Sequence, residues 1–206
     1  MVDFRDILMH KTGIYMKSIK GTQTEQNLLT SFAGESQARN RYTFFASQAK
    51  KDGYVLVSAV FSEIAEQEKE HAKRMFKYLE GGSLAITATY PAGAMGSTVD
   101  NLKAAAAGEN EEWSVAYPAM ANTAEQEGFP EIAAMYRMIG AAEKYHEERF
   151  RRLCARIEDG TMFRNGTPIV WRCRNCGFVC EAPEAPESCP ACAHPRDYFE
   201  RLNETF

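Results

Sequence analysis

The sequence lacks the features that would place it in a membrane or on nucleic acid. None of its 206 residues belongs to an apolar run of the roughly 20 residues that cross a bilayer, and residues 1–21 contain no stretch resembling a signal peptide. The formal net charge is -4 and no basic patch is visible, whereas a general nucleic-acid binder needs a basic face to displace counterions from phosphate. We therefore expect a cytoplasmic protein without a membrane segment or a nucleic-acid partner.

Cysteine and histidine are also scarce, with 6 and 4 residues respectively. Cytosolic reductants discourage structural disulfides, so these cysteines predict metal ligands and free thiols. Half of the histidines end a Glu-x-x-His tetrad, in Glu68–His71 and in Glu143–His146. Residues three apart lie on one helix face, so each tetrad directs a carboxylate and an imidazole to the same point, as metal ligands require.

Both tetrads occupy positions where the helical pattern predicts core residues. The preceding core-facing positions are apolar, namely Val57, Phe61 and Ile64 in one helix and Ile132, Tyr136 and Ile139 in the other. One such tetrad is common by chance on a solvated helix face. A buried carboxylate or imidazole without a partner is costly, however, so two copies on core faces indicate a shared metal ion.

Capping residues and glycines predict long helices at about 22–51, 54–80, 97–128 and 130–160, with a loop at 83–96. These helices form a duplicated pair. Glu35 recurs as Glu109 at an offset of 74 (109 minus 35), whereas Glu68 recurs as Glu143 at an offset of 75 (143 minus 68). One residue is therefore inserted in the third helix, where Pro118 also disturbs the helical hydrogen bonds. Such an insertion is usually absorbed as a π-bulge, frequently at a functional site.

The inward-facing polar groups form one constellation: Glu35, Glu68, His71, Glu109, Glu112, Glu143 and His146. One Glu from each of two helices plus Glu-x-x-His from each of the others resembles the ligand set of ferritin-like di-iron bundles. Carboxylates with imidazoles suit iron or manganese better than zinc. Tyr42 and Tyr117 also face inward, either to hydrogen-bond the ligand carboxylates or simply to pack.

Two helical glycines, Gly34 and Gly108, each precede a predicted ligand and cost up to about 1 kcal/mol relative to alanine. They indicate close helix packing beside the site or a relic of the duplication. Trp113, Glu147 and the other nearby charges are interpreted as packing or solvated residues.

A second metal site follows residues 161–170, which are interpreted as a linker. Its predicted ligands are Cys173, Cys176, Cys189 and Cys192, in two Cys-x-x-Cys pairs separated by 12 residues. This spacing predicts a tetrahedral sulfur site, although it does not distinguish iron from zinc. Residues 171–206 are too few to stabilise a core alone, so we expect the metal to hold the module together. Cys154 and Cys180 are expected to be free thiols.

The order of these motifs, over residues 22–206, resembles the rubrerythrin family. The motifs that carry the resemblance are Glu68-x-x-His71, Glu109-x-x-Glu112, Glu143-x-x-His146, Cys173-x-x-Cys176-Gly177 and Cys189-Pro190-x-Cys192. The resemblance implies an all-α, ferritin-like four-helix bundle followed by a small rubredoxin-like β domain. One departure is Ala193, which stands where many rubredoxin knuckles have glycine.

The resemblance also implies a function: a non-haem iron peroxidase that reduces hydrogen peroxide to water in oxidative stress defence. It implies seven ligands for two irons and a third iron held by the four cysteines. That third iron would relay electrons from a reductase or rubredoxin, and ultimately from NAD(P)H. Glu112 would be the mobile ligand, exchanged with His71 on reduction. A head-to-tail homodimer would place each cysteine module beside the bundle of its neighbour.

Two alternatives differ from this interpretation. An iron-storage ferroxidase shares the bundle, but a fused electron-transfer module and the additional Glu112 argue against it. A zinc-ribbon adaptor on a helical scaffold would leave the seven inward-facing ligands unexplained. Residues 1–21 show no sustained periodicity and are interpreted as an arm that packs on a neighbouring subunit, with His10 exposed.

Overall fold

The computed structural model describes residues 7–9 and 15–202. Most of the predicted arm, including His10, lies outside the described residues, as do residues 203–206. Within the arm, β1 (Ile7–Met9) pairs antiparallel with β2 (Tyr15–Lys17). In the described part of the chain, no helix has the length and apolar character needed to cross a membrane.

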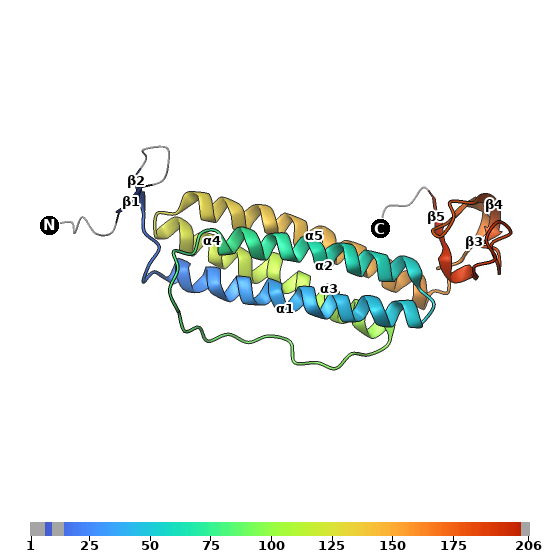
Figure 1. Cartoon of the computed structure of the whole chain (residues 1–206), viewed down its shortest axis with the longest axis horizontal. Coiled ribbons are helices and arrows are strands. Elements are labelled where there is room, and N and C mark those ends of the chain that lie inside the picture. Colours follow the sequence, from blue (N-terminus) through green and yellow to red (C-terminus); the bar gives the residue numbers. More distant parts are fainter. Residues whose placement is uncertain (1–6, 10–14, 203–206) are drawn as a thin grey trace.

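The bundle consists of α1 (Gln23–Lys51), α2 (Val55–Phe76), the third helix and α5 (Pro130–Glu158). The third helix comprises α3 (Thr98–Glu111), a π-helical segment η2 (Glu112–Ala116) and α4 (Tyr117–Gln126). In Figure 1 these helices run side by side along the long axis, and the connection from α2 to α3 follows one side of the bundle. The predicted four-helix bundle is confirmed, and so is the predicted π-bulge between Glu109 and Ala121.

Local sequence explains where the helices begin. The Thr22 side chain accepts a hydrogen bond from the Glu25 backbone N–H at the start of α1. Ser97 and Asp100 form a reciprocal capping box at the start of α3, and Pro130 occupies the first turn of α5. These residues satisfy backbone N–H groups that have no partner inside the helix, or remove one of them.

The duplication is visible in the turns. Asp52, after α1, accepts hydrogen bonds from the Thr98 backbone N–H and hydroxyl at 3.0 and 2.6 Å. Glu127, after α4, accepts the same two bonds from Thr24 at 2.8 and 2.6 Å. Each half of the bundle therefore places a carboxylate at the helix N-terminus of the other half, where negative charge is favourable.

Apolar side chains fill the bundle on both sides of its polar middle. One cluster contains Tyr42, Phe61 and Phe150, whose rings contact one another with centroids 4.9–5.9 Å apart. The other cluster contains Leu28 and Tyr136. The apolar residues predicted to face the core before each tetrad are all buried, so the interpretation of these stripes is confirmed.

The cysteine module is a three-stranded antiparallel sheet with β3 (Arg164–Cys173) between β4 (Val179–Glu184) and β5 (Phe199–Arg201). A short 3-10 helix, η3 (Arg196–Tyr198), precedes β5. The predicted linker 161–170 is therefore wrong for most of its length. Ile169 and Val170, which are β-branched and suit a strand, pair with β4, and only residues 159–163 connect α5 to β3.

This short connection keeps the module at the end of its own bundle. Tyr54 stacks on Phe163 with ring centroids 6.2 Å apart and planes at 4°, and Figure 1 shows the sheet beyond the C-terminal end of α5. At the opposite end, Lys17 donates to the Glu127 carbonyl at 2.8 Å, and the Ile19 N–H donates to Glu80 at 2.9 Å. Residues 17–19 of the arm thus contact their own bundle, and packing of the arm on a neighbouring subunit stays a prediction.

Candidate metal centre

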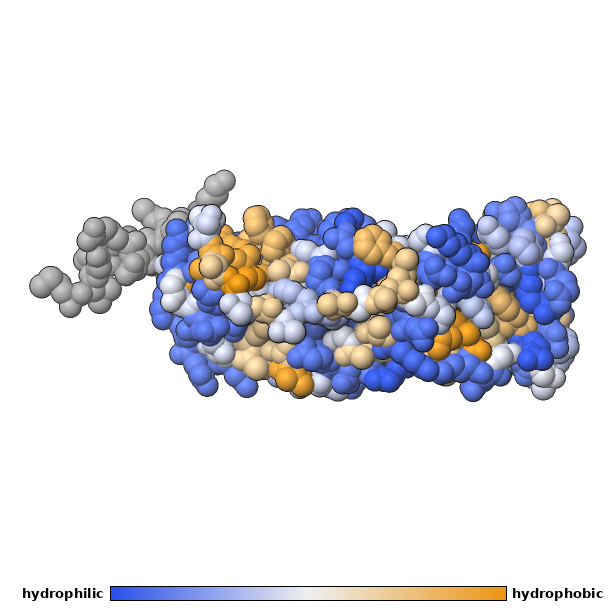
Figure 2. All heavy atoms as spheres, turned by 90° about the horizontal axis from the view of Figure 1, so that it is seen from below, coloured by the Kyte–Doolittle hydropathy of each residue, from blue (hydrophilic) through white to orange (hydrophobic). Residues whose placement is uncertain are grey.

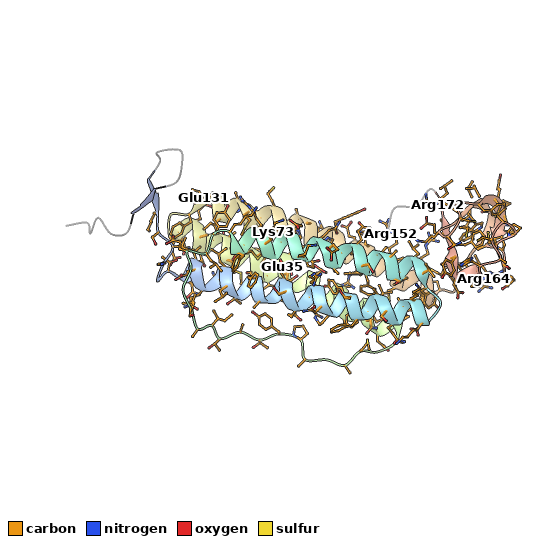
Figure 3. All side chains as sticks on the ribbon, in the orientation of Figure 1. Glu35, Lys73, Glu131, Arg152, Arg164 and Arg172 are labelled. Carbon is orange, nitrogen blue, oxygen red and sulfur yellow. The ribbon has the colours of Figure 1, made fainter. Side chains whose placement is uncertain are left out.

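The polar middle of the bundle is a cluster of buried acids and imidazoles contributed by all four helices. Glu35, Glu68, Glu109 and Glu143 are at most 1% exposed, and His146 is 3% exposed. Figure 3 shows the Glu35 side chain within the bundle. These residues interrupt otherwise apolar helix faces, so the helical periodicity that buries their neighbours buries them as well.

The cluster divides into two overlapping groups. The first contains Glu35, Glu68, His71 and Glu143, and the second contains Glu68, Glu109, Glu143 and His146. Within each group, one potential ligand atom of every residue lies within 4.8 Å of the others. Two adjacent cations sharing Glu68 and Glu143 as bridging carboxylates match this arrangement. Six of the seven predicted bundle ligands are brought together in this way, whereas Glu112 belongs to neither group.

Several oxygen and nitrogen atoms of the cluster lie close together but do not form hydrogen bonds with one another. His146 Nδ1 lies 2.8 Å from Glu143 Oε2 and 3.0 Å from Glu68 Oε1, yet none of these three atoms has a hydrogen-bond partner among the described residues. Glu35 Oε2 and Glu109 Oε2 are buried and unpartnered in the same way. Because an unsatisfied buried acceptor costs about 1–3 kcal/mol, this cluster fits cations better than it fits its own side chains. Carboxylates with imidazoles are a donor set suited to iron or manganese.

Without cations, protons balance the charge of the cluster. Burial, followed by the charge of Glu143, raises the pKa of Glu35 well above its usual value, and burial raises that of Glu109 to about 8. Burial alone would lower the pKa of both imidazoles. The close negative carboxylates outweigh burial by stabilising the protonated rings, and they raise the pKa of His71 to about 10 and that of His146 to about 12. Cations must therefore displace protons to bind.

Three further side chains orient the cluster. The Tyr42 hydroxyl donates to Glu109 Oε1 at 2.5 Å, and the Tyr117 hydroxyl donates to Glu35 Oε1. Each tyrosine thus holds the carboxylate of the other duplicated half. His146 Nε2 lies 3.0 Å from Gln67 Oε1; with Nε2 as the donor, Nδ1 is left as the metal-facing atom. Gln67 was not predicted, because spacing along one helix gives no signal of a contact between helices.

The π-helical segment is held to α5 by another unpredicted cluster. Glu147 accepts hydrogen bonds from Trp113 Nε1 at 2.5 Å, from Asn110 Nδ2 at 3.1 Å and from Arg151 Nε at 2.6 Å. The interpretation of Glu147 as a solvated residue is wrong, because its side chain is buried and accepts hydrogen bonds from three donors, whereas packing of Trp113 agrees with the prediction. This cluster fixes the segment that begins with Glu112.

Glu112 lines a groove formed by α1, the third helix and the α2–α3 connection, with a volume of about 690 Å³. The groove also changes the interpretation of the two glycines. A Cβ at Gly34 would meet the Tyr90 ring at 3.5 Å, and one at Gly108 would come no closer than 3.9 Å to Arg41. Neither distance shows a neighbouring helix backbone in close approach, so the predicted close helix packing at these glycines is wrong.

The second predicted site is a compact group of the four cysteines, with their sulfurs within 4.8 Å of one another. Sγ of Cys173 lies 3.8 Å from that of Cys192, and Sγ of Cys176 lies 3.6 Å from that of Cys189. A tetrahedron with metal–sulfur bonds of about 2.3 Å has edges of about 3.8 Å, so the group fits zinc or iron. A backbone hydrogen bond from His194 lowers the pKa of Cys192 to about 6, whereas, despite a backbone hydrogen bond from Phe178, contacts with the other three cysteines raise that of Cys176 to about 12. A metal would therefore displace thiol protons on binding.

Each cysteine pair closes a turn in which the residue after the second cysteine has positive φ. In the first turn this residue is Gly177, with a φ of 77°, and in the second it is Ala193, with a φ of 59°. The departure noted in the sequence therefore falls at a position where a side chain is strained. Cys154 and Cys180 are free thiols, as expected.

The bundle and its buried cluster define the class: a ferritin-like carboxylate bundle with a di-metal type of site, fused to a four-cysteine module. Comparisons with known proteins agree with this. The family model described as "Rubrerythrin" matches residues 26–154, and that described as "Rubrerythrin, rubredoxin-like domain" matches residues 171–200. The chain belongs to the rubrerythrin family.

Individual relatives cover almost the whole chain. A rubrerythrin of Porphyromonas gingivalis is 60% identical over 92% of this chain and 95% of its own length. A rubrerythrin of Nitratidesulfovibrio vulgaris is 54% identical over 91% of this chain and 98% of its own. Among solved structures, partially reduced nigerythrin has a TM-score of 0.58 and 27% identity, covering 93% of this chain and 89% of that one.

Proposed function

We propose that the chain is a non-haem di-iron peroxidase that reduces hydrogen peroxide to water. The observation that carries the proposal is the pair of buried ligand groups sharing Glu68 and Glu143, together with a four-cysteine site in the same chain. Family membership supports the same activity. Bound iron would supply the two electrons that cleave the O–O bond, and the four-cysteine iron would relay electrons from an NAD(P)H-linked reductase or a rubredoxin.

The predicted ligands of the bundle would hold two metal ions in adjacent positions. Glu68 and Glu143 would bridge the ions, Glu35 and His71 would complete one position, and Glu109 and His146 the other. The bundle buries this cluster, which keeps bulk water from it.

Glu112 and the two tyrosines would have different parts. Glu112 has no hydrogen-bond partner among the described residues, so its carboxyl is free to approach an ion or to hold a proton for a departing oxygen. Tyr42 and Tyr117 would hold Glu109 and Glu35 in place, which fixes the distance between the two ion positions.

The test begins with anaerobic loading with ferrous iron. We expect three irons per chain, two in the bundle and one in the cysteine module, and a red colour when the module iron is ferric. Hydrogen peroxide should then oxidise the reduced protein in a stopped-flow experiment and be converted to water. If metal analysis after loading finds zinc and no iron, the chain is a zinc-ribbon adaptor instead. If it finds more iron than the three sites can hold, the chain stores iron.

We further propose that electrons pass between chains of a homodimer. Glu158 at the end of α5 lies 12 residues after His146 (158 minus 146), which is roughly 18 Å along a helix. The module packs beyond that end, so a neighbour's module in a head-to-tail pair would reach the cluster more directly. Because electron transfer falls steeply with distance, the neighbour is the favoured donor.

Complementation tests this arrangement. One chain carries Glu68→Ala and His71→Ala, and the other carries Cys173→Ser and Cys176→Ser. Heterodimers should recover peroxidase activity that neither parent shows. If heterodimers verified by mass remain inactive, electrons stay within one chain.

A further inference from the structure

The groove beside the candidate metal centre is far larger than hydrogen peroxide requires. Its volume is about 690 Å³, and it reaches Glu112 and Tyr117 at the edge of the buried cluster. A water molecule occupies about 30 Å³ of liquid and hydrogen peroxide has only one more oxygen atom, so the proposed substrate leaves most of the groove unused. Pockets for organic ligands have volumes of about 300–1,000 Å³.

The groove is lined mainly by small and apolar side chains. They include Gly34, Ala104, Ala107, Gly108, Tyr90 and Met120. Gly34 and Gly108 each cost their helix about 1 kcal/mol relative to alanine, and close helix packing does not account for them. What a glycine provides at both positions is space, directly before Glu35 and Glu109 in the sequence.

The connection between α2 and α3 forms the outer wall of the groove. The Tyr90 hydroxyl donates to the Thr30 carbonyl at 2.6 Å, which ties this connection to α1. Figure 2 views the molecule from this side, and pale and orange spheres lie along the middle of the face among the blue ones. Polar groups such as Gln37, Arg41 and Glu111 also line the groove, and Glu112 lines it together with the apolar residues.

We propose that this groove is a subsite for the organic group of alkyl and aryl hydroperoxides, which the chain reduces to alcohols. The inference rests on the proposed function, because the same site would break the O–O bond. A hydroperoxide ROOH takes up two electrons and two protons and yields ROH and water. The electrons are those that the four-cysteine relay delivers in the hydrogen peroxide reaction, so no further reductant is needed.

The orientation follows from which lining residues are polar and which are apolar. The hydroperoxide head is polar and belongs beside Glu112 and Tyr117, whereas R is apolar and belongs along Ala104 and Ala107. Burying apolar surface contributes about 25 cal/mol per Å². The organic group R therefore contributes binding free energy only if the groove has space to bury it. A large side chain at Ala107, on the wall and outside the predicted ligands, should therefore block R and spare hydrogen peroxide.

The experiment compares wild type, Ala107→Phe and a matched control, Ala119→Phe, at an exposed position of α4 that does not line the groove. Steady-state turnover is measured on iron-loaded protein with hydrogen peroxide and with cumene hydroperoxide. Wild type and Ala119→Phe should reduce both. Ala107→Phe should lose about tenfold or more in kcat/KM for cumene hydroperoxide, within the range for a blocked apolar pocket, and should keep its rate with hydrogen peroxide.

A binding measurement without turnover accompanies the kinetics. 2-Phenyl-2-propanol, the alcohol formed from cumene hydroperoxide, is titrated into metal-free protein and followed by NMR shifts of groove residues. Binding should be present in wild type and in Ala119→Phe and lost in Ala107→Phe.

The failures of the two proposals are distinguishable. Reduction of hydrogen peroxide without reduction of cumene hydroperoxide overturns the subsite and leaves the proposed function intact. Equal turnover of cumene hydroperoxide by Ala107→Phe and wild type, or alcohol binding that Ala107→Phe does not change, also overturns it. If neither peroxide is reduced, the proposed function fails and this inference fails with it.

Discussion

Replacing Glu112 by leucine should stabilise the metal-free protein while impairing the metal-loaded one. Glu112 has no hydrogen-bond partner among the described residues, and burial, followed by the charge of Glu109, raises its pKa well above the usual value. Leucine has a similar size and needs no partner. Moving a polar side chain from water into a protein costs about 1–3 kcal/mol, and because Glu112 is only partly buried, we take the lower end, about 1 kcal/mol.

Glu109→Leu is the matched control, because it also removes a predicted ligand from the same helix. Glu109 accepts a hydrogen bond from Tyr42, which is 1% exposed. Without this acceptor the buried hydroxyl is left unsatisfied, at about 1–3 kcal/mol. His146 Nδ1, 3.8 Å from Glu109 Oε2, also loses a neighbouring negative charge, so the losses exceed what is gained by removing the unpartnered Oε2. The two substitutions should therefore change the stability of metal-free protein in opposite directions.

The assay is thermal unfolding of metal-free protein, followed by helical circular dichroism. For a chain of this size, 1 kcal/mol corresponds to a Tm change of about 2–4 °C. We expect Glu112→Leu to raise Tm by about that amount and Glu109→Leu to lower it by at least as much. After iron loading, Glu112→Leu should be oxidised by peroxide more slowly than wild type. A metal-free Glu112→Leu that unfolds below wild type, as Glu109→Leu does, would refute the reasoning.

Ala193→Gly should stabilise the cysteine module by up to about 1 kcal/mol, because alanine is strained at a φ of 59°; an unchanged denaturant midpoint for loss of the module's metal would contradict this. Ferrous iron should release several protons from metal-free protein near pH 7, because the pKa values of His71 and His146 are raised to about 10 and 12 and that of Glu109 to about 8. Since these protons oppose the metal, apparent affinity should rise with pH, and a pH-stat titration without proton release would exclude this account.

Much of the fold followed from local spacing. The Glu-x-x-His tetrads lie on one helix face whatever the helix packs against, and Cys-x-x-Cys pairs form metal-binding turns by themselves. The change in offset from Glu35–Glu109 to Glu68–Glu143 likewise reports a helical insertion without reference to tertiary contacts, and η2 is where that insertion was predicted. In each case the relevant geometry lies within a few residues of one helix or turn.

The predictions that were wrong concerned features that depend on contacts between distant parts of the chain. The strand at Arg164–Cys173 was missed because its pairing with β4 and β5 decides where it starts, and the short run before Trp171 has a weak pattern. Glu147 was interpreted as a solvated or packing residue because its burial depends on Trp113 and Asn110, which lie 34 and 37 residues away in the sequence.

The sequence by itself determined the four helices, the residue types of both candidate metal sites and the position of the π-helical insertion, because these depend on the periodicity of one helix or the spacing within one turn. Only the tertiary structure decided that Tyr42 holds Glu109 and Tyr117 holds Glu35, across 67 and 82 residues, and that an open groove leads to Glu112. Such contacts arise from how separate helices pack, and no local pattern encodes the distance between two helices.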